Sequence, residues 1–268
     1  MLKLVNKRLP RTATVKLAEY QKSVNEAGGY SDQVDKAKRT FKQRNRKTNA
    51  AFKKVKEKLL EMCNGSRRCM YCEDSVADEV EHFQPKDLYP EVVFAWKNYF
   101  YACGPCNGPK NSKFSVINSA TVLVDVTRKV RAPITPPAKG KMALIDPRRE
   151  NPLDFMMLDL RDTFEFTSIT TDGSEDDLRA TYTIYILRLN ERDYLVDARR
   201  NALGGFRARL KEYVDARNSG GSRSDLRLLR EGIRRAPHPT VWAEMVRQRN
   251  HYPKIKVLFD AAPEAVAF

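Results

Sequence analysis

The amino-acid sequence predicts an α+β fold in which helices flank a small core that contains cysteines. Three observations predict it: helical periodicity in the first quarter of the chain, four cysteines in two close pairs, and short strand-like runs followed by helical ones towards the C-terminus. We therefore expect three parts in the 268 residues: a basic helical arm over residues 1–67, a core over 68–140, and a mixed, then mainly helical scaffold region over 141–268.

The composition excludes membrane, secreted disulfide-rich and fibrous proteins. Hydrophobic residues make up 41% of the chain and charged residues 31%, a balance typical of folded soluble proteins. No run approaches the roughly 18 uninterrupted apolar residues of a membrane-spanning helix, and the first residues lack the apolar segment of a secretory signal. Together with the paired cysteines, this predicts a protein of the reducing cytoplasm with no membrane partner.

Positive charge is concentrated in the N-terminal arm. The formal net charge is +15, and residues 1–68 hold 19 Lys and Arg residues against 6 Asp and Glu residues. Such clusters attract the phosphate backbone of nucleic acids, and Lys42 and Arg46 lie in the densest run. A solvated helix face is the alternative interpretation. A membrane surface is less favoured, because the arm lacks an apolar face rich in Trp, Phe and Leu.

The arm is expected to contain two helices. Apolar residues recur at helical spacing over residues 12–26, and Gly28-Gly29 ends this helix. Ser31 is a suitable N-cap for a second helix that continues to about residue 62.

Shorter elements are expected in the rest of the chain. Residues 63–114 are rich in Cys, Gly, Pro and aromatic residues, which predicts two or three short strands and then a short helix. Proline and glycine residues between 133 and 140 mark a loop, and Ser174 can cap a helix over 175–189. The remaining expected elements are strands over 143–146, 155–160 and 164–169, and helices over 191–216, 225–235 and 239–249.

Four of the five cysteines form two pairs with metal-binding spacing. Cys69 and Cys72 make one CxxC pair, and Cys103 and Cys106 make the other. Two intervening residues let both thiolates of a pair reach one ion, and zinc prefers four such ligands in a tetrahedron. We expect structural zinc, with a segment inserted between the pairs because the 30 residues between them exceed the separation in an ordinary zinc ribbon. Cys63 has no such partner and is expected to be an ordinary thiol.

A histidine between the cysteine pairs is the candidate catalytic base. A zinc ion with four cysteine ligands has no open position, so chemistry must come from other residues. His82 is the sole histidine in the first 237 residues, and it follows Glu81. Neutral imidazole is a suitable base for water at about pH 7, whereas a carboxylate and an amide oxygen, here Glu81 and Asn107, suit Mg²⁺. For His82 taken alone, a structural role is the alternative.

The order of these motifs resembles that of the zinc-containing HNH endonucleases. The resemblance covers about residues 68–114 and rests on CxxC, Glu81-His82-Phe83-x-Pro85, Trp96-x-Asn98 and CxxC-Asn107-x-x-Lys110. It implies a ββα-metal core, in which a hairpin and a helix hold one catalytic Mg²⁺ or Mn²⁺ beside structural Zn²⁺ on the four cysteines.

The resemblance also implies a role for each matched residue. His82 corresponds to the general base, and Glu81 and Asn107 correspond to the ligands of the catalytic metal, with Glu79 as the alternative carboxylate. Asn98 corresponds to the asparagine that shapes the loop and helps to hold the histidine. The residues expected to contact nucleic acid are Lys110, which matches the lysine after the last cysteine pair, and Lys86, Lys113, Lys42 and Arg46. The implied activity is hydrolysis of phosphodiester bonds, with DNA the favoured target and RNA, including tRNA, left open.

A second resemblance is longer but rests on short, dispersed matches over about residues 1–200. These include Leu144-Ile145-Asp146-Pro147 and Leu189-Asn190-Glu191-Arg192. They resemble the HNH subunits, called PtuB, of Septu anti-phage defence systems, some of which accompany retrons. The resemblance implies an ABC/SMC-like ATPase partner of the PtuA type, and the chain has no Walker A motif of its own. The alternatives are a solitary restriction or repair HNH nuclease and a non-catalytic, zinc-stabilised nucleic-acid-binding module.

Overall fold

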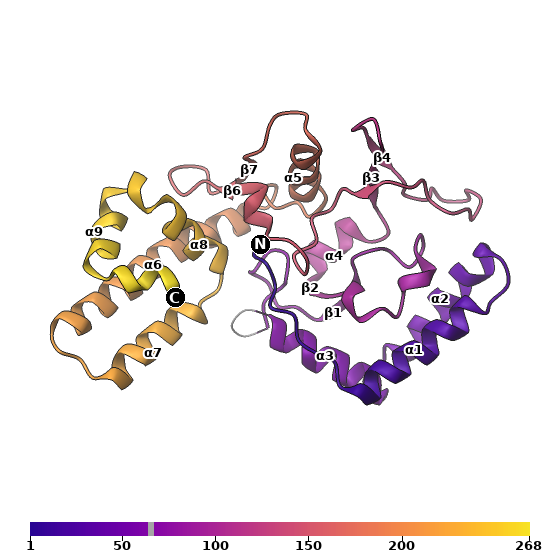
Figure 1. Ribbon diagram of the computed structural model, residues 1–268, viewed down its shortest axis with the longest axis horizontal. Coiled ribbons are helices and arrows are strands. Elements are labelled where there is room, and N and C mark those ends of the chain that lie inside the picture. The colour runs from indigo at the N-terminus through magenta and orange to yellow at the C-terminus, as the bar shows by residue number, and fades with distance from the viewer. Residues whose placement is uncertain (64–66) are drawn as a thin grey trace.

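The computed structural model describes residues 1–63 and 67–268, and within them the chain has a mixed α/β fold with three small sheets (Figure 1). Three helices come first: α1 (Arg11–Asn25), α2 (Tyr30–Arg44) and α3 (Ala50–Met62). The first matches the helix predicted over residues 12–26. The three helices lie along one side of the central strands in Figure 1.

The single helix predicted from Ser31 to about residue 62 is wrong, because the chain breaks it after Arg44. Asn49 caps a new helix, its side-chain oxygen accepting a hydrogen bond from the backbone N–H of Phe52 at 3.1 Å. The break brings Phe41 of α2 against Phe52 of α3, with ring centroids 5.6 Å apart in an edge-to-face arrangement. Tertiary packing of aromatic rings therefore overrides the continuous helical pattern.

A short antiparallel hairpin and a helix form the centre of the molecule. β1 (Glu79–His82) pairs with β2 (Tyr99–Ala102), and His82 lies opposite Tyr99. α4 (Gly104–Lys110) follows β2 almost directly, so the expected strands and short helix are both present. In a second sheet, β3 (Ser115–Ile117) pairs with β4 (Leu123–Asp125) and β5 (Lys141–Met142).

The C-terminal region is mainly helical after a third, two-stranded sheet. β6 (Met156–Leu158) pairs with β7 (Phe166–Ser168), which agrees with the predicted strands over 155–160 and 164–169. Ser174 caps α5 as expected, its hydroxyl accepting from the N–H of Asp177 at 3.2 Å. The helices are α5 (Glu175–Ile186), α6 (Asp193–Asn218), α7 (Arg223–Arg234), α8 (Pro239–Gln248) and α9 (Pro253–Ala261), of which the last has no counterpart among the predicted elements.

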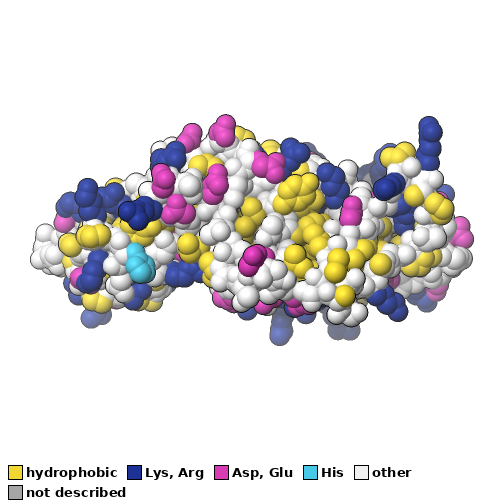
Figure 2. All heavy atoms as spheres, turned by 90° about the horizontal axis from the view of Figure 1, so that it is seen from above, with side chains coloured by type: hydrophobic (Ala, Val, Ile, Leu, Met, Phe, Trp, Pro, Cys, Tyr) yellow, Lys and Arg dark blue, Asp and Glu magenta, His cyan; other side chains and the backbone are white. Residues whose placement is uncertain are grey.

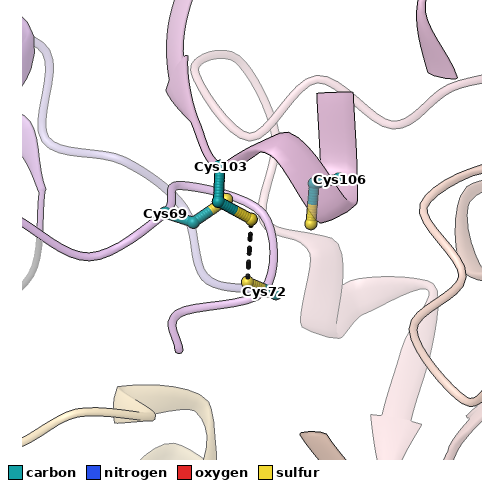
Figure 3. Close-up of side chains that lie close together, drawn as sticks. All are labelled: Cys69, Cys72, Cys103 and Cys106. Atoms are coloured by element: carbon teal, nitrogen blue, oxygen red, sulfur yellow. Dashed lines mark hydrogen bonds between the residues drawn. The ribbon is translucent and has the colours of Figure 1, made fainter. Parts of the chain in front are cut away.

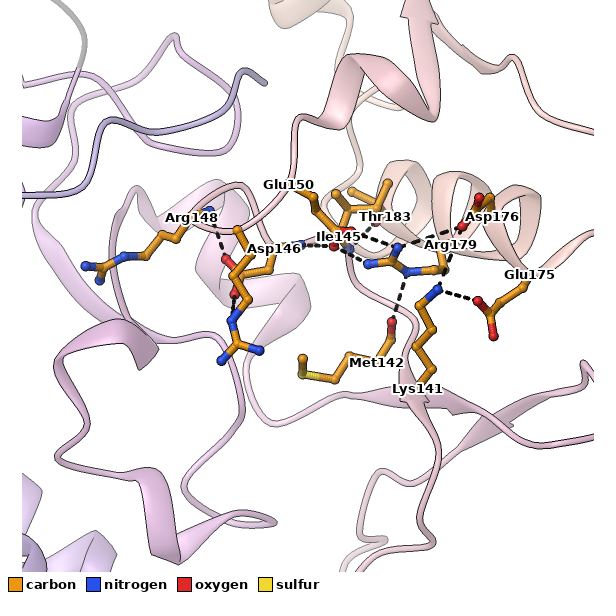
Figure 4. A network of polar contacts seen from close by, with 11 residues as sticks. Lys141, Met142, Ile145, Asp146, Arg148, Glu150, Glu175, Asp176, Arg179 and Thr183 are labelled. Atoms are coloured by element: carbon orange, nitrogen blue, oxygen red, sulfur yellow. Dashed lines mark hydrogen bonds and ion pairs between the residues drawn. The ribbon is translucent and has the colours of Figure 1, made fainter.

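The strand predicted over residues 143–146 does not form in the described chain. The N–H of Ala143 still donates to the carbonyl oxygen of Ser115 in β3, but beyond it side chains become the hydrogen-bond partners (Figure 4). The N–H of Ile145 donates to the hydroxyl of Thr183 at 3.0 Å. Just beyond, the carboxylate of Asp146 accepts from the N–H of Arg148 at 2.9 Å. The segment therefore packs as a buried turn against α5.

Arg148 joins the N-terminal segment to the central hairpin. Its guanidinium donates to the carbonyl oxygens of Trp96 and Tyr99 at 2.7 and 2.8 Å and to the side-chain oxygen of Asn6 at 2.8 Å. It also lies over the Trp96 ring, 4.6 Å from the centroid. The segment after the Leu-Ile-Asp-Pro motif thus fixes the start of β2, where Tyr99 lies opposite His82.

The surface is basic at both ends of the molecule. On the face shown in Figure 2, Lys and Arg side chains gather at the two ends and an apolar area lies between them. The positive charge is therefore not confined to the N-terminal arm. None of the helices in the described residues combines the length and apolar character needed to span a membrane.

Candidate metal centre and active site

The four paired cysteines come together in one buried cluster (Figure 3). Their sulfur atoms all lie within 4.8 Å of one another, and those of Cys72 and Cys103 are 3.8 Å apart. A tetrahedral zinc ion with Zn–S bonds of about 2.3 Å needs sulfur atoms about 3.8 Å apart. The predicted gathering of the cysteines is confirmed, and the cluster could bind zinc.

Local structure explains why two distant segments meet at this cluster. One pair lies in the turn before β1, and the other begins α4, where Cys103 is the N-cap residue and Cys106 lies in the first turn. Hydrogen bonds among the thiols lower the pKa of Cys72 and Cys103, whereas burial and the same hydrogen bonds raise the pKa of Cys69 and Cys106, so the four thiols share their protons unequally. Cys63 lies outside the cluster, and burial raises the pKa of its thiol to about 12. It is therefore an unreactive thiol, as expected.

Arg192 contacts the cluster from the C-terminal region, which the sequence analysis does not anticipate. Its Nη2 donates to the sulfur of Cys106 at 3.4 Å and to the carbonyl oxygen of Leu187 at 3.1 Å. The one sequence signal for Arg192 is its place in the Leu-Asn-Glu-Arg motif. In that motif the side chain of Asn190 accepts from the backbone N–H of Phe166 and donates to its carbonyl oxygen. The motif therefore holds a cation beside the cysteines.

His82 is buried at the end of β1, with 6% of its surface exposed. Its Nε2 lies 3.0 Å from the carbonyl oxygen of Val93. A carbonyl can only accept, so Nε2 carries the proton and Nδ1 is left as a proton acceptor. Burial, together with the positive charges of Lys86 and Lys110, lowers the pKa of His82 to about 3. The imidazole is therefore neutral at neutral pH.

The Asn98 side chain forms hydrogen bonds to the loop that contains Val93, the hydrogen-bond partner of His82. Its side-chain oxygen accepts from the N–H of Gln84 at 2.8 Å, and its side-chain nitrogen donates to the carbonyl oxygens of Gln84 and Val92 at 3.0 and 3.1 Å. Because Val92 precedes Val93, this buried amide fixes the carbonyl to which His82 is bound. A contribution of Asn98 to catalysis stays a prediction.

Glu81 and Lys110 form a buried ion pair between β1 and α4. Both side chains are almost fully enclosed, with exposures of 2% and 0%. Lys110 also donates to the carbonyl oxygen of His82 at 2.8 Å, and the hydroxyl of Tyr71 donates to the second carboxylate oxygen of Glu81 at 3.0 Å. In this arrangement Lys110 does not face solvent, and each carboxylate oxygen of Glu81 already accepts a hydrogen bond.

A cavity of about 330 Å³ opens beside His82. Glu79 and Asn107 lie together on its wall, the amide nitrogen of Asn107 donating to the Glu79 carboxylate. Of the lysines and the arginine expected to contact nucleic acid, Lys86 lines this cavity. Lys42, Arg46 and Lys113 are exposed and do not line it. Lys56 of α3 does line it, although nothing in the sequence distinguishes this lysine from its neighbours.

The chain is similar to one curated protein over a short stretch. It is 46% identical over 63 residues to the Septu protein PtuB of Bacillus thuringiensis, and the matched stretch covers 22% of this chain and 24% of the relative. No family model matches the chain, and no solved structure matches it. The chain thus spans about a quarter of the relative's length, and within that stretch it is a partial homologue of a Septu protein.

Proposed function

We propose that this protein is a metal-dependent HNH endonuclease that hydrolyses phosphodiester bonds of nucleic acid, with DNA as the principal candidate. One observation carries the proposal: His82 is neutral and held through Nε2 beside a cavity that it shares with Glu79 and Asn107. The non-catalytic binding module would need the cysteines but has no use for this base. The similarity to a Septu protein supports the same activity class.

The chain's own residues would prepare water and position the phosphate. Nδ1 of His82 accepts a proton from the attacking water, while the Val93 carbonyl holds the ring in one tautomer. Lys86 supplies positive charge at the cavity wall. A divalent cation, when bound, would stabilise negative charge on the phosphate and the leaving oxygen. The side-chain oxygen of Asn107 and one carboxylate of β1 are the oxygen ligands that such an ion prefers.

Two carboxylates compete for the metal, and the geometry favours Glu79. The family resemblance assigns the role to Glu81, but Glu81 is paired with Lys110 and Tyr71 in a buried site. Both carboxylates line the cavity, but Glu79 is exposed and already contacts Asn107. For Glu81 to bind an ion beside Asn107, one of its hydrogen-bond donors would have to leave.

The test is cleavage of circular DNA, both single-stranded and as supercoiled plasmid, in Mg²⁺ or Mn²⁺ by the wild type and by His82→Ala, Glu79→Gln and Glu81→Gln. Metal analysis first establishes that each variant retains zinc. We expect His82→Ala and Glu79→Gln to lose at least about a hundredfold in rate, and Glu81→Gln to act chiefly on stability. Equal cleavage by the wild type and His82→Ala would exclude His82 as the base. If Glu81→Gln lost cleavage activity and Glu79→Gln did not, Glu81 would be the metal ligand instead of Glu79.

We further propose that the nuclease serves anti-phage defence together with an ABC/SMC-like ATPase of the PtuA type. The support is the similarity to a Septu protein over 63 residues. Co-expression with an ABC/SMC-like ATPase of the PtuA type should yield a stoichiometric complex, and cleavage should then depend on that partner. A chain that digests host DNA alone at physiological salt would instead fit the solitary restriction or repair nuclease.

A further inference from the structure

We propose that the cavity beside His82 accepts a nucleotide of a single strand and excludes an intact duplex. This inference rests on the proposed nuclease function and names the class of its substrate. It starts from the enclosure of the base: the His82 side chain is 6% exposed, although it lines the cavity. A phosphodiester must enter that cavity to come within hydrogen-bond reach of Nδ1.

The N-terminal helices form the wall that encloses His82. The ring of Phe41, on α2, packs edge-to-face against the imidazole with centroids 4.3 Å apart. Asn45, just after α2, and Lys56, on α3, line the same side of the cavity. The helices along the hairpin in Figure 1 are therefore a wall of the site as well as a basic surface.

The opposite wall belongs to α4 and the loop that follows it. Asn107, Asn111 and Ser112 line this side, and β1 forms the floor between the two walls. The site is thus a recess bounded by helical segments on two sides, not an open platform across the hairpin.

The size of the recess matches one nucleotide. Its volume of about 330 Å³ is near the lower end of the roughly 300–1,000 Å³ typical of small-molecule sites. In a duplex, base pairing holds each phosphate on the outside of a rigid cylinder, which cannot bend into such a recess. A single strand can turn its backbone and splay one nucleotide, as enzymes that act on extruded nucleotides require.

The recess carries both signs of charge. The carboxylates of Asp78, Glu79, Glu81 and Asp87 line it, and of these Glu81 is paired with Lys110 and Asp87 with Lys38. Lys56 and Lys86 both line it, and neither forms an ion pair within 4.0 Å among the described residues, although Lys38, Lys54 and Lys58 do. The ammonium of Lys86 lies 5.9 Å from the centroid of Phe41, which directs it towards the same wall. Two unpaired cations in a partly enclosed site are suited to one strand of phosphates.

Binding of labelled oligonucleotides to the full-length, zinc-loaded chain tests the inference without requiring turnover. The probes are a twelve-residue oligothymidine and a twelve-base-pair duplex, followed by fluorescence anisotropy in the absence of Mg²⁺. We expect Lys56→Gln to weaken binding of the single strand by about fivefold and to leave duplex binding unchanged. Lys53→Gln is the matched control, because Lys53 is an exposed lysine of the same helix that does not line the cavity.

The outcomes separate this inference from the proposed activity. Equal weakening of single-strand and duplex binding by Lys56→Gln would overturn it, as would single-strand binding that does not respond to Lys56→Gln. If single-strand binding depends on Lys56 but neither probe is cut when Mn²⁺ and the ATPase are added, the cavity binds a single strand as proposed, and the nuclease proposal fails. If both are cut and the duplex is cut faster, the nuclease stands and the recess inference fails.

Discussion

At the scale of single residues, the site depends on a histidine that is kept neutral by its surroundings. Phe41 and Tyr99 pack against the two sides of the His82 ring with centroid distances of 4.3 and 5.3 Å, which excludes water from most of the imidazole. The Val93 carbonyl satisfies the one ring donor. The imidazole is deprotonated in this environment, and its charged form is costly unless an anion such as a phosphate enters the cavity.

The depressed pKa of His82 predicts a pH dependence of folding stability. The pKa falls from 6.5 to about 3 on folding, chiefly through burial and then through Lys86, so the unfolded chain binds this proton more readily than the folded one. The contribution of His82 to the free energy of unfolding should therefore be at its full value above about pH 6.5. As the pH is lowered below about 6.5, the free energy of unfolding should decrease by up to about 1.4 kcal/mol per pH unit.

Urea unfolding of the wild type and His82→Gln between about pH 7 and about pH 5, in excess zinc, measures this slope. Carboxylates and His238, whose pKa is also lowered by burial, contribute to both proteins, so the difference between the slopes isolates His82. Parallel slopes would mean that the imidazole is not desolvated in the folded protein.

At the scale of elements, the buried pair of Glu81 and Lys110 fixes α4 against β1. Strands of four residues such as β1 and β2 form only a marginal hairpin by themselves. Lys110 contacts the carboxylate of Glu81 and the carbonyl of His82, so one ammonium joins the last turn of the helix to the end of the strand. The position of His82 therefore depends on the helix that follows β2.

Replacement of Lys110 tests this joint. Lys110→Met leaves the Glu81 carboxylate buried without its partner, and we expect a loss of about 3–5 kcal/mol in the free energy of unfolding. The double variant with Glu81→Gln should recover part of the loss. Lys58→Met is the matched control, because Lys58 pairs with Glu61 near the surface of α3 and its loss should cost at most about 1 kcal/mol. If Lys110→Met lowered the free energy of unfolding by no more than Lys58→Met does, Lys110 would not be what fixes α4 against β1.

The sequence predicts the local features of these elements better than their distant partners. The spacing of Cys69, Cys72, Cys103 and Cys106 predicts a cluster because two short turns each bring a pair of thiols together, and the structure confirms it. The helix break after Arg44 was not predictable from periodicity, since it arises from packing between helices. The partner of Glu81 lies 29 residues away on α4, and Lys56 reaches the cavity from a separate helix. Neither contact leaves a local sequence signal.

At the scale of the whole molecule, the C-terminal region is part of the metal centre's surroundings. Glu73, next to Cys72, accepts hydrogen bonds from the backbone N–H and hydroxyl of Thr240 in α8 at 3.0 and 2.8 Å. Arg192, just before α6, contacts Cys106 on the other cysteine pair. Both halves of the cluster are thus tied to helices that follow it by more than 80 residues. The C-terminal region therefore contacts the cluster on the side of each cysteine pair.

Arg192 should therefore influence how firmly zinc is held. Four thiolates around Zn²⁺ carry a net charge of about −2, and a guanidinium with an N–H directed at one sulfur stabilises that charge. We expect Arg192→Gln to release zinc to a chromogenic chelator about tenfold faster than the wild type, with Arg192→Lys between the two because it keeps the charge but not the fork of donors. Arg200→Gln is the control, since Arg200 lies on α6 but pairs with Asp197 at the surface. Circular dichroism before chelation establishes that the variants are folded. Equal release rates for Arg192→Gln and Arg200→Gln would show that the cluster holds its metal without help from the C-terminal region.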